Sequence, residues 1–211
     1  MTAQAASADA AIAHRTRMIH SCTLSLILRM PHDRFSAGPH WLPAAAQRPR
    51  MSPTWWHWAA SRDSLTARLR AASTQPFGVR LLAQGISRPQ RDEAQALELE
   101  PRARIWRREV MLMLGETPWV AARSVAPLAS LHGARLQSLG TRSLGSWLFR
   151  QPGLERGPIE IIRSPTPTLV TAHGRVAPWG RRSILRLGRT SILVQEFFLD
   201  TMGADLALPS R

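Results

Sequence analysis

Hydrophobic and polar residues alternate along several short segments of the chain, and this alternation is typical of β-strands. It is clearest in ARIWRREVMLML at residues 103–114 and in SILVQEFFL at residues 191–199. Turns that contain Gly separate these two runs from neighbouring strand-like segments, which indicates two hairpins. In all, the pattern predicts six strands, over residues 75–84, 103–114, 118–127, 158–163, 180–187 and 191–199.

Helical segments fall in groups between the predicted strands. Ser52 and Ser64 each precede an apolar stretch and have side chains that suit an N-cap, so a helix is expected after each. Residues 128–149 are expected to be helical in two pieces, broken at Gly140. With mostly antiparallel strands, this arrangement predicts an α+β fold with a single domain over residues 51–203.

The two ends of the chain differ from this domain in composition. Residues 1–50 are rich in Ala, Ser, Pro, His and Arg and nearly free of acidic residues. They are predicted to be an N-terminal extension that is disordered or arises from too early a start codon. Residues 204–211 are predicted to be a loose C-terminal tail.

Two charged residues lie on otherwise apolar faces of predicted strands. Glu196 shares a face of the last strand with Ile192, Val194 and Phe198, and the opposite face is also largely apolar. Arg108 is the corresponding exception on one face of segment 103–114. Burying either charge is costly unless something pairs with it. The two residues are therefore expected either to form a buried ion pair or to lie apart and hold opposite ends of a buried ligand.

Composition narrows the range of functions. All 28 basic residues are Arg, against 14 acidic residues, and the net charge is +14. These arginines are spread along the chain, so a site for a small anion fits the charge at least as well as nucleic-acid binding does. The single Cys22 excludes an internal disulfide and favours a reducing, cytoplasmic compartment. The sequence has no metal-ligand spacing and no apolar run long enough to span a membrane.

Several blocks of the sequence together resemble one protein family. The blocks are WRREVMLMLGETPWVAARSVAP, SLGTRSLGSWLF, PWGRRSILRL and ILVQEFFL. Their order and spacing are similar to those of the bacterial chorismate pyruvate-lyases (chorismate lyases, or 4-hydroxybenzoate synthases), from about Pro53 to Met202. The resemblance rests on several separate blocks, which makes it more specific than one short motif.

The resemblance carries expectations about fold and activity. It implies a six-stranded antiparallel sheet, helices that form flaps over a buried ligand site, a monomer, and no metal or cofactor. It also implies the conversion of chorismate to 4-hydroxybenzoate and pyruvate, the first step of ubiquinone biosynthesis. The expected partners are thus the small molecules chorismate and 4-hydroxybenzoate, with no nucleic acid and no membrane span.

The family's motifs match four residues of this sequence. They place the ligand-binding Arg at Arg108, the buried Glu at Glu196, an apolar contact at Leu144, and another at Leu65, where the family usually has Met. On this resemblance, Arg108 is expected to bind the ring carboxylate, and Glu196 to lie near the C4 hydroxyl and take or steer the departing proton. In the alternative, the proton moves within the substrate and Glu196 only orients it. The Leu at position 65 leads us to expect looser retention of the product.

Three further arginines have two interpretations each. Arg181 and Arg182 could meet the enolpyruvyl carboxylate of chorismate or be solvated strand residues. Arg123 could be a second cation at the ring end or a structural partner of Glu109.

Two other classes of function stay open at this point. Effector-binding domains of some transcription regulators look similar to this lyase fold, and a fold does not determine a function. Such a regulator is expected to carry a DNA-binding segment, yet no winged-helix pattern precedes residue 51. A nucleic-acid-binding protein would need a clustered basic face.

Overall fold

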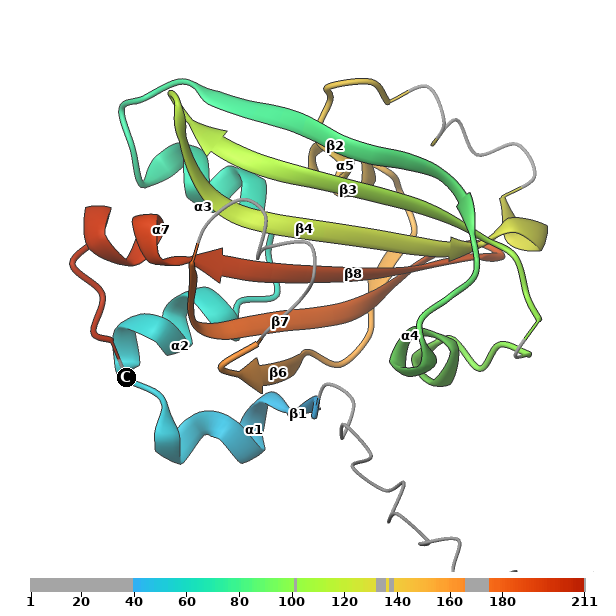
Figure 1. The fold of residues 1–211 in the computed structure, drawn as a ribbon, viewed down its shortest axis with the longest axis horizontal. Helices are drawn as coiled ribbons and strands as arrows, with labels where there is room; N and C mark the ends of the chain where they lie inside the picture. Colours follow the sequence, from blue (N-terminus) through green and yellow to red (C-terminus); the bar gives the residue numbers. More distant parts are fainter. Residues whose placement is uncertain (1–39, 101, 132–135, 137–138, 166–174, 211) are drawn as a thin grey trace, which may run out of the picture. The chain divides into compact units, whose positions relative to one another are not determined.

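The computed structural model describes residues 40–100, 102–131, 136, 139–165 and 175–210. One eight-stranded sheet organises them, in the order β1-β6-β7-β8-β4-β3-β2, with β5 also paired to β7 (Figure 1). All of the pairings are antiparallel, which confirms the predicted α+β class. The strands are β1 (Leu42–Pro43), β2 (Phe77–Ser87), β3 (Ile105–Leu114), β4 (Thr117–Pro127), β5 (Leu154–Arg156), β6 (Glu160–Arg163), β7 (Val176–Leu187) and β8 (Thr190–Leu199).

Short helices connect the strands. At both predicted N-caps, the Ser hydroxyl accepts a backbone N–H, from Trp55 to Ser52 at 3.2 Å and from Ala67 to Ser64 at 3.3 Å, which confirms these two helix starts. The helical elements are α1 (Ala44–Gln47), η1 (Arg48–Arg50), α2 (Pro53–Ala59), α3 (Leu65–Ala71), α4 (Arg91–Ala96), η2 (Leu128–Ser130), α5 (Leu144–Leu148) and α7 (Asp200–Asp205).

The count of eight strands differs from the predicted six. The additional strands are β1 and β5, which have two and three residues. A strand this short shows no alternation, so it forms only because a longer neighbour offers backbone partners. β6 pairs with β1, and β7 pairs with β5.

The domain begins earlier than the predicted boundary at residue 51. Trp41 is buried against Phe197, with ring centroids 6.0 Å apart, and β1 then pairs with β6. The described part of the predicted extension, residues 40–50, is therefore part of the domain. Residues 1–39 lie outside the described residues.

The end of the chain also contacts the domain, in contrast to the predicted loose tail. Trp119 donates its indole N–H to Asp205 at 2.7 Å, and Trp55 donates to the carbonyl of Pro209 at 2.6 Å. Within the helical prediction for 128–149, η2 and α5 are present, while residues 132–135 and 137–138 lie outside the described residues.

The two faces of the sheet carry different apolar clusters. On one face, a cluster that includes Leu65, Leu112 and Phe198 faces α2, α3 and α7, and a second that includes Leu144 and Leu185 lies at α5. On the opposite face, Ile105, Val125 and Leu193 pack against α4, and Met111 and Phe197 pack with Trp41. The alternation predicted for segments 103–114 and 191–199 is confirmed, because alternate residues enter clusters on opposite faces.

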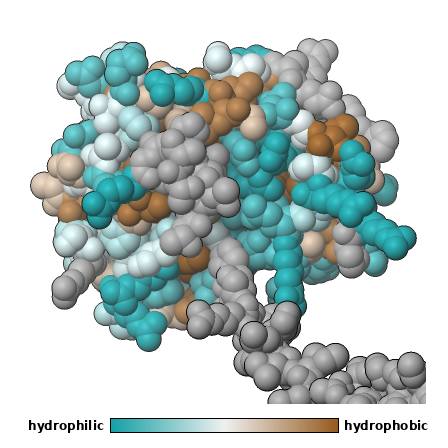
Figure 2. Space-filling view, in the orientation of Figure 1, coloured by the Kyte–Doolittle hydropathy of each residue, from teal (hydrophilic) through white to brown (hydrophobic). Residues whose placement is uncertain are grey.

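Large apolar side chains are mostly inside the part of the chain that the structure describes. On the face shown in Figure 2, hydrophobic residues form separate small areas between hydrophilic ones. The exposed large hydrophobic residues among those described are Leu81 and Ile86, both on the edge strand β2. None of the described helices has the length and apolar character needed to cross a membrane.

Candidate active site

A pocket lies between the two apolar clusters on the face covered by α3 and α5. It encloses about 550 Å³ of space free of protein atoms, including its opening to solvent. Most of its lining is apolar and comes from β2, β3, β4, β7, β8, α3 and α5. The charged residues of the lining are Arg108, Arg156 and Glu196. An apolar pocket with a few convergent charges is typical of a small-molecule site.

Arg108 enters the pocket from β3 as a buried cation. Its side chain donates to Gln84 Oε1 at 2.7 Å and to the carbonyls of Gly140 and Arg142 at 2.7 and 3.2 Å. The residue is only 2% exposed, and burial lowers the pKa of its guanidinium. No carboxylate among the described residues forms an ion pair with it. Neutral acceptors thus hold the guanidinium in place, and an anionic ligand would supply the missing counter-charge.

Glu196 enters the same pocket from β8 and is held by Arg181. Arg181 Nε donates to Glu196 Oε2 at 2.6 Å, while its Nη1 donates to the carbonyls of Trp58 and Ser61, each at 3.0 Å. Those carbonyls lie at the C-terminal end of α2, where a cation is favoured. Among the described residues, only Arg181 hydrogen bonds to Glu196, so Oε1 is available to a ligand.

Arg108 and Glu196 do not pair with each other. Arg108 is opposite Ser124 on β4, whereas Glu196 is opposite Ala122. A strand spacing of about 4.8 Å and a rise of about 3.3 Å per residue then put their Cα atoms roughly 12 Å apart. Of the two expected arrangements, the structure has the one in which the charges lie apart on one pocket.

The two predicted apolar residues lie at the helices that cover the pocket. Leu65 is the first residue of α3 and Leu144 the first of α5, and both are buried. A buried hydrogen bond of 2.8 Å between the hydroxyls of Thr66 and Ser143 joins the two helix starts. A Cβ added at Gly145 would lie 3.2 Å from Thr66 Oγ1, so the close approach of α3 and α5 favours Gly there.

The third charged residue of the lining, Arg156, was not among the residues singled out from the sequence. It lies on β5, a strand too short to show alternation, so its face could not be predicted. The only feature of the sequence that could have suggested a role for Arg156 is its position two residues after Leu154, just before the apolar segment 158–163.

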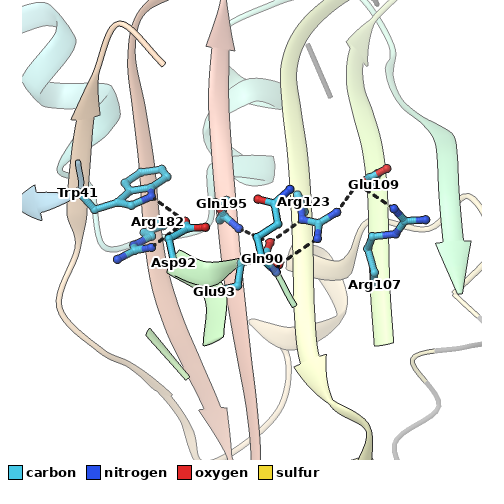
Figure 3. Close-up of polar contacts among 9 residues, drawn as sticks. All are labelled: Trp41, Gln90, Asp92, Glu93, Arg107, Glu109, Arg123, Arg182 and Gln195. Atoms are coloured by element: carbon cyan, nitrogen blue, oxygen red, sulfur yellow. Dashed lines mark hydrogen bonds and ion pairs between the residues drawn. The ribbon is translucent and has the colours of Figure 1, made fainter. Parts of the chain in front are cut away.

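Arg123 lies on the opposite face of the sheet, away from the pocket. It donates to Glu93 at 2.5 and 2.9 Å and also forms an ion pair with Glu109 (Figure 3). Burial alone lowers the pKa of Arg123, but the hydrogen bonds and charges of Glu93 and Glu109 raise it above its usual value. The structural interpretation of Arg123 is therefore the one that the geometry supports.

Arg181 and Arg182 point to opposite faces because they are adjacent in one strand. Arg182 donates to Glu160 at 2.7 Å and to Asp92 at 3.3 Å, and its guanidinium lies 4.7 Å from the centre of the Trp41 ring. Both arginines are buried, so neither is a solvated strand residue. Neither belongs to the pocket lining, and Arg181 reaches the pocket only through Glu196.

Within the described ranges, no group of three or more His, Cys, Asp or Glu residues is placed to hold a metal ion.

Comparisons with known proteins show the family of this chain. A family model described as chorismate lyase matches residues 39–203. The chain belongs to the chorismate lyase family. A protein of Chromohalobacter salexigens named probable chorismate pyruvate-lyase is 69% identical over 183 residues, which cover 86% of this chain and all of that protein. A Pseudomonas aeruginosa protein of the same name is 42% identical over 167 residues, which cover 77% of this chain and 92% of that protein.

Solved structures outside the chorismate lyase family overlap only in part. PhnF from Mycobacterium smegmatis has a TM-score of 0.49 and 15% identity, over 67% of this chain and 66% of that chain. A GntR-family transcriptional regulator from Enterococcus faecalis has a TM-score of 0.41 and 12% identity, over 60% of this chain and 92% of that chain. Overlaps at this level say nothing about the function of this chorismate lyase family member.

Proposed function

We propose that this protein is a chorismate pyruvate-lyase, which converts chorismate to 4-hydroxybenzoate and pyruvate. The observation that carries the proposal is the buried guanidinium of Arg108, which has no carboxylate partner among the described residues and faces an apolar pocket. Membership of the chorismate lyase family supports the same activity.

The proposed binding mode uses Arg108 and Glu196 as opposite ends of the site. Arg108 takes the ring carboxylate of chorismate, because a planar guanidinium matches a carboxylate with two parallel hydrogen bonds. Glu196 faces the C4 hydroxyl through its available Oε1. Leu65 and Leu144 contact the ring between them and exclude water.

The proposed reaction is an elimination that makes the ring aromatic. The bond between ring carbon C3 and the ether oxygen breaks, and the hydrogen on C4 leaves as a proton. The enolpyruvyl fragment gains a proton on its methylene carbon and departs as pyruvate, so atoms and charge balance. Arg181 fixes the direction of the Glu196 carboxylate toward the C4 end of the ring, where it orients the hydroxyl as the proton moves.

Aromatisation supplies much of the driving force, and on that ground we propose that the reaction needs no cofactor. The same proposal includes a monomeric, cytoplasmic enzyme without a nucleic-acid partner, whose product enters ubiquinone biosynthesis.

The test mixes purified protein with chorismate and follows 4-hydroxybenzoate and pyruvate together. Equimolar formation of both is expected, and Arg108→Ala and Glu196→Ala should each lower kcat/KM at least about 100-fold, as for loss of a charged group that contacts the transition state. Arg163→Ala and Glu100→Ala are the matched controls, since both residues are exposed, and they should retain activity.

Two other outcomes would contradict the lyase. A folded protein that binds 4-hydroxybenzoate without turning over chorismate would be an effector-binding domain of the same fold. A folded protein that binds neither molecule would show that the pocket has been assigned wrongly.

A further inference from the structure

The pocket contains a second cation, the half-buried Arg156, that the binding mode above does not use. Arg156 lines it from β5, and its buried Nε has no hydrogen-bond partner among the described residues. None of the ion pairs within the described part of the chain includes Arg156. Its guanidinium lies over the ring of Phe149, 5.1 Å from the centroid. The ring contacts one face of the guanidinium, which leaves the N–H donors at its edge for another group.

Electrostatics at Arg156 favour an additional anion. Burial lowers the pKa of Arg156 to about 10; the charge of Glu196 opposes this shift, whereas Arg181 and Arg62 add to it. The guanidinium is thus still protonated at neutral pH but is destabilised by its surroundings. A ligand carboxylate that paired with it would offset this cost.

The strand order places Glu196 between the two pocket cations. Arg108 lies on β3, two strands from Glu196 on β8, and Arg156 lies on β5, which pairs with β7 on the other side of β8. Arg156 is close enough to Glu196 for their charges to interact. A ligand whose one end is held by Arg108 can therefore reach both Glu196 and Arg156 at its other end.

Chorismate has the charges that this arrangement requires. One carboxylate is on the ring, and the other is on the enolpyruvyl group attached at C3, next to the C4 hydroxyl. We propose that Arg156 binds the enolpyruvyl carboxylate while Arg108 binds the ring carboxylate. This assignment rests on the proposed lyase function. It means that Arg156 contacts the substrate and the departing pyruvate but does not contact 4-hydroxybenzoate, which has lost that carboxylate.

The test separates substrate from product binding in Arg156→Gln. We expect kcat/KM for chorismate to fall about 10- to 100-fold, as for loss of a charge-assisted hydrogen bond, and the Kd of 4-hydroxybenzoate to stay within about twofold of the wild-type value. Arg156→Lys keeps the charge and should recover part of kcat/KM. If Arg156→Gln does not fold, by circular dichroism, the same comparison is made with Arg156→Lys, which should still lower kcat/KM without changing the Kd of 4-hydroxybenzoate.

Arg163→Gln is the matched control. It removes one positive charge at an exposed position of β6 outside the pocket, so it should change neither quantity. An Arg156 variant that behaves like this control would overturn the assignment, as would an equal loss of affinity for substrate and product. Absence of turnover by the wild-type protein would overturn the lyase function and this assignment with it, whereas normal wild-type turnover with an unaffected Arg156 variant would overturn the assignment alone.

Discussion

Neighbouring residues in one strand have different roles here because their side chains point to opposite faces of the sheet. Arg181 holds Glu196 at the pocket, whereas Arg182 pairs with Glu160 and Asp92 on the other side. Arg181 is thus a positioning residue that acts through Glu196.

Replacing Arg181 should affect stability and activity in separable ways. Arg181→Met leaves the partly buried Glu196 carboxylate without a partner, so we expect the free energy of unfolding to fall by about 3 kcal/mol. We also expect kcat to fall at least about tenfold, because the carboxylate is no longer oriented. Urea unfolding and steady-state kinetics measure the two effects.

The double variant Arg181→Met with Glu196→Gln distinguishes orientation from simple damage to the fold. Since it contains no unpaired charge at this position, it should be more stable than the sum of the two single variants predicts, by about 1–3 kcal/mol. It should nevertheless remain inactive. Additive losses of stability would show that the ion pair is not what Arg181 contributes.

At the scale of elements, helix α4 holds together the face of the sheet that lies away from the pocket. Its N-terminus is a capping box in which Glu93 accepts the backbone N–H of Gln90 at 2.8 Å. The same carboxylate is fully buried and accepts hydrogen bonds from Arg123 on β4 and Gln195 on β8 (Figure 3). The Glu93 side chain thus caps the start of the helix and also hydrogen bonds to side chains of the two central strands β4 and β8.

Loss of the Glu93 charge should therefore destabilise the whole domain. Glu93→Gln is expected to lower the free energy of unfolding by about 3–5 kcal/mol, because Arg123 stays buried with half of its ion pairs removed. Chemical denaturation measures the change. Glu100→Gln, the same substitution at an exposed position, should shift the value by less than about 0.5 kcal/mol. Equal effects at the two positions would argue against this role for α4.

On the scale of the whole molecule, residues 40–51, which precede the first predicted helix, cover one edge of the sheet. Leu42 pairs with Ile161, Trp41 donates its indole N–H to Asp92 at 3.2 Å, and Met51 is buried in the main apolar cluster. Residues 40–51 thus connect strand β6 to α4 and to the core.

Two truncations test where the domain begins. A chain that starts at His40 should keep the wild-type free energy of unfolding to within about 0.5 kcal/mol and keep its activity, as expected if the preceding residues are an extension. A chain that starts at Ser52 loses a buried Trp and should be less stable by at least about 3 kcal/mol. Thermal and urea unfolding of both truncated chains, with the full chain as reference, measure the differences in stability. Equal stability of the two truncated chains would place the boundary back at residue 51.

Much of the fold could be predicted because its long strands show the alternation of side chains that is typical of a β-strand. Alternation in β3 and β8 located both strands and assigned Arg108 and Glu196 to faces that turned out to line one pocket. Helix α4 was not predicted, because it is short, polar and capped by Gln90 where Ser or Thr is usual. Arg156 was missed because β5 has too few residues to show a pattern.

By itself, the sequence determined the main strands, the faces on which Arg108 and Glu196 lie, and the family. Those properties depend on the pleat of a strand and on residues close together along the chain. Only the tertiary structure decided which groups meet: that Arg181 and not Arg108 pairs with Glu196, that Glu93 joins Arg123 to Gln195, and that Arg156 enters the pocket. The reason is physical, because these partners come from strand order and register, which bring together residues far apart in the chain.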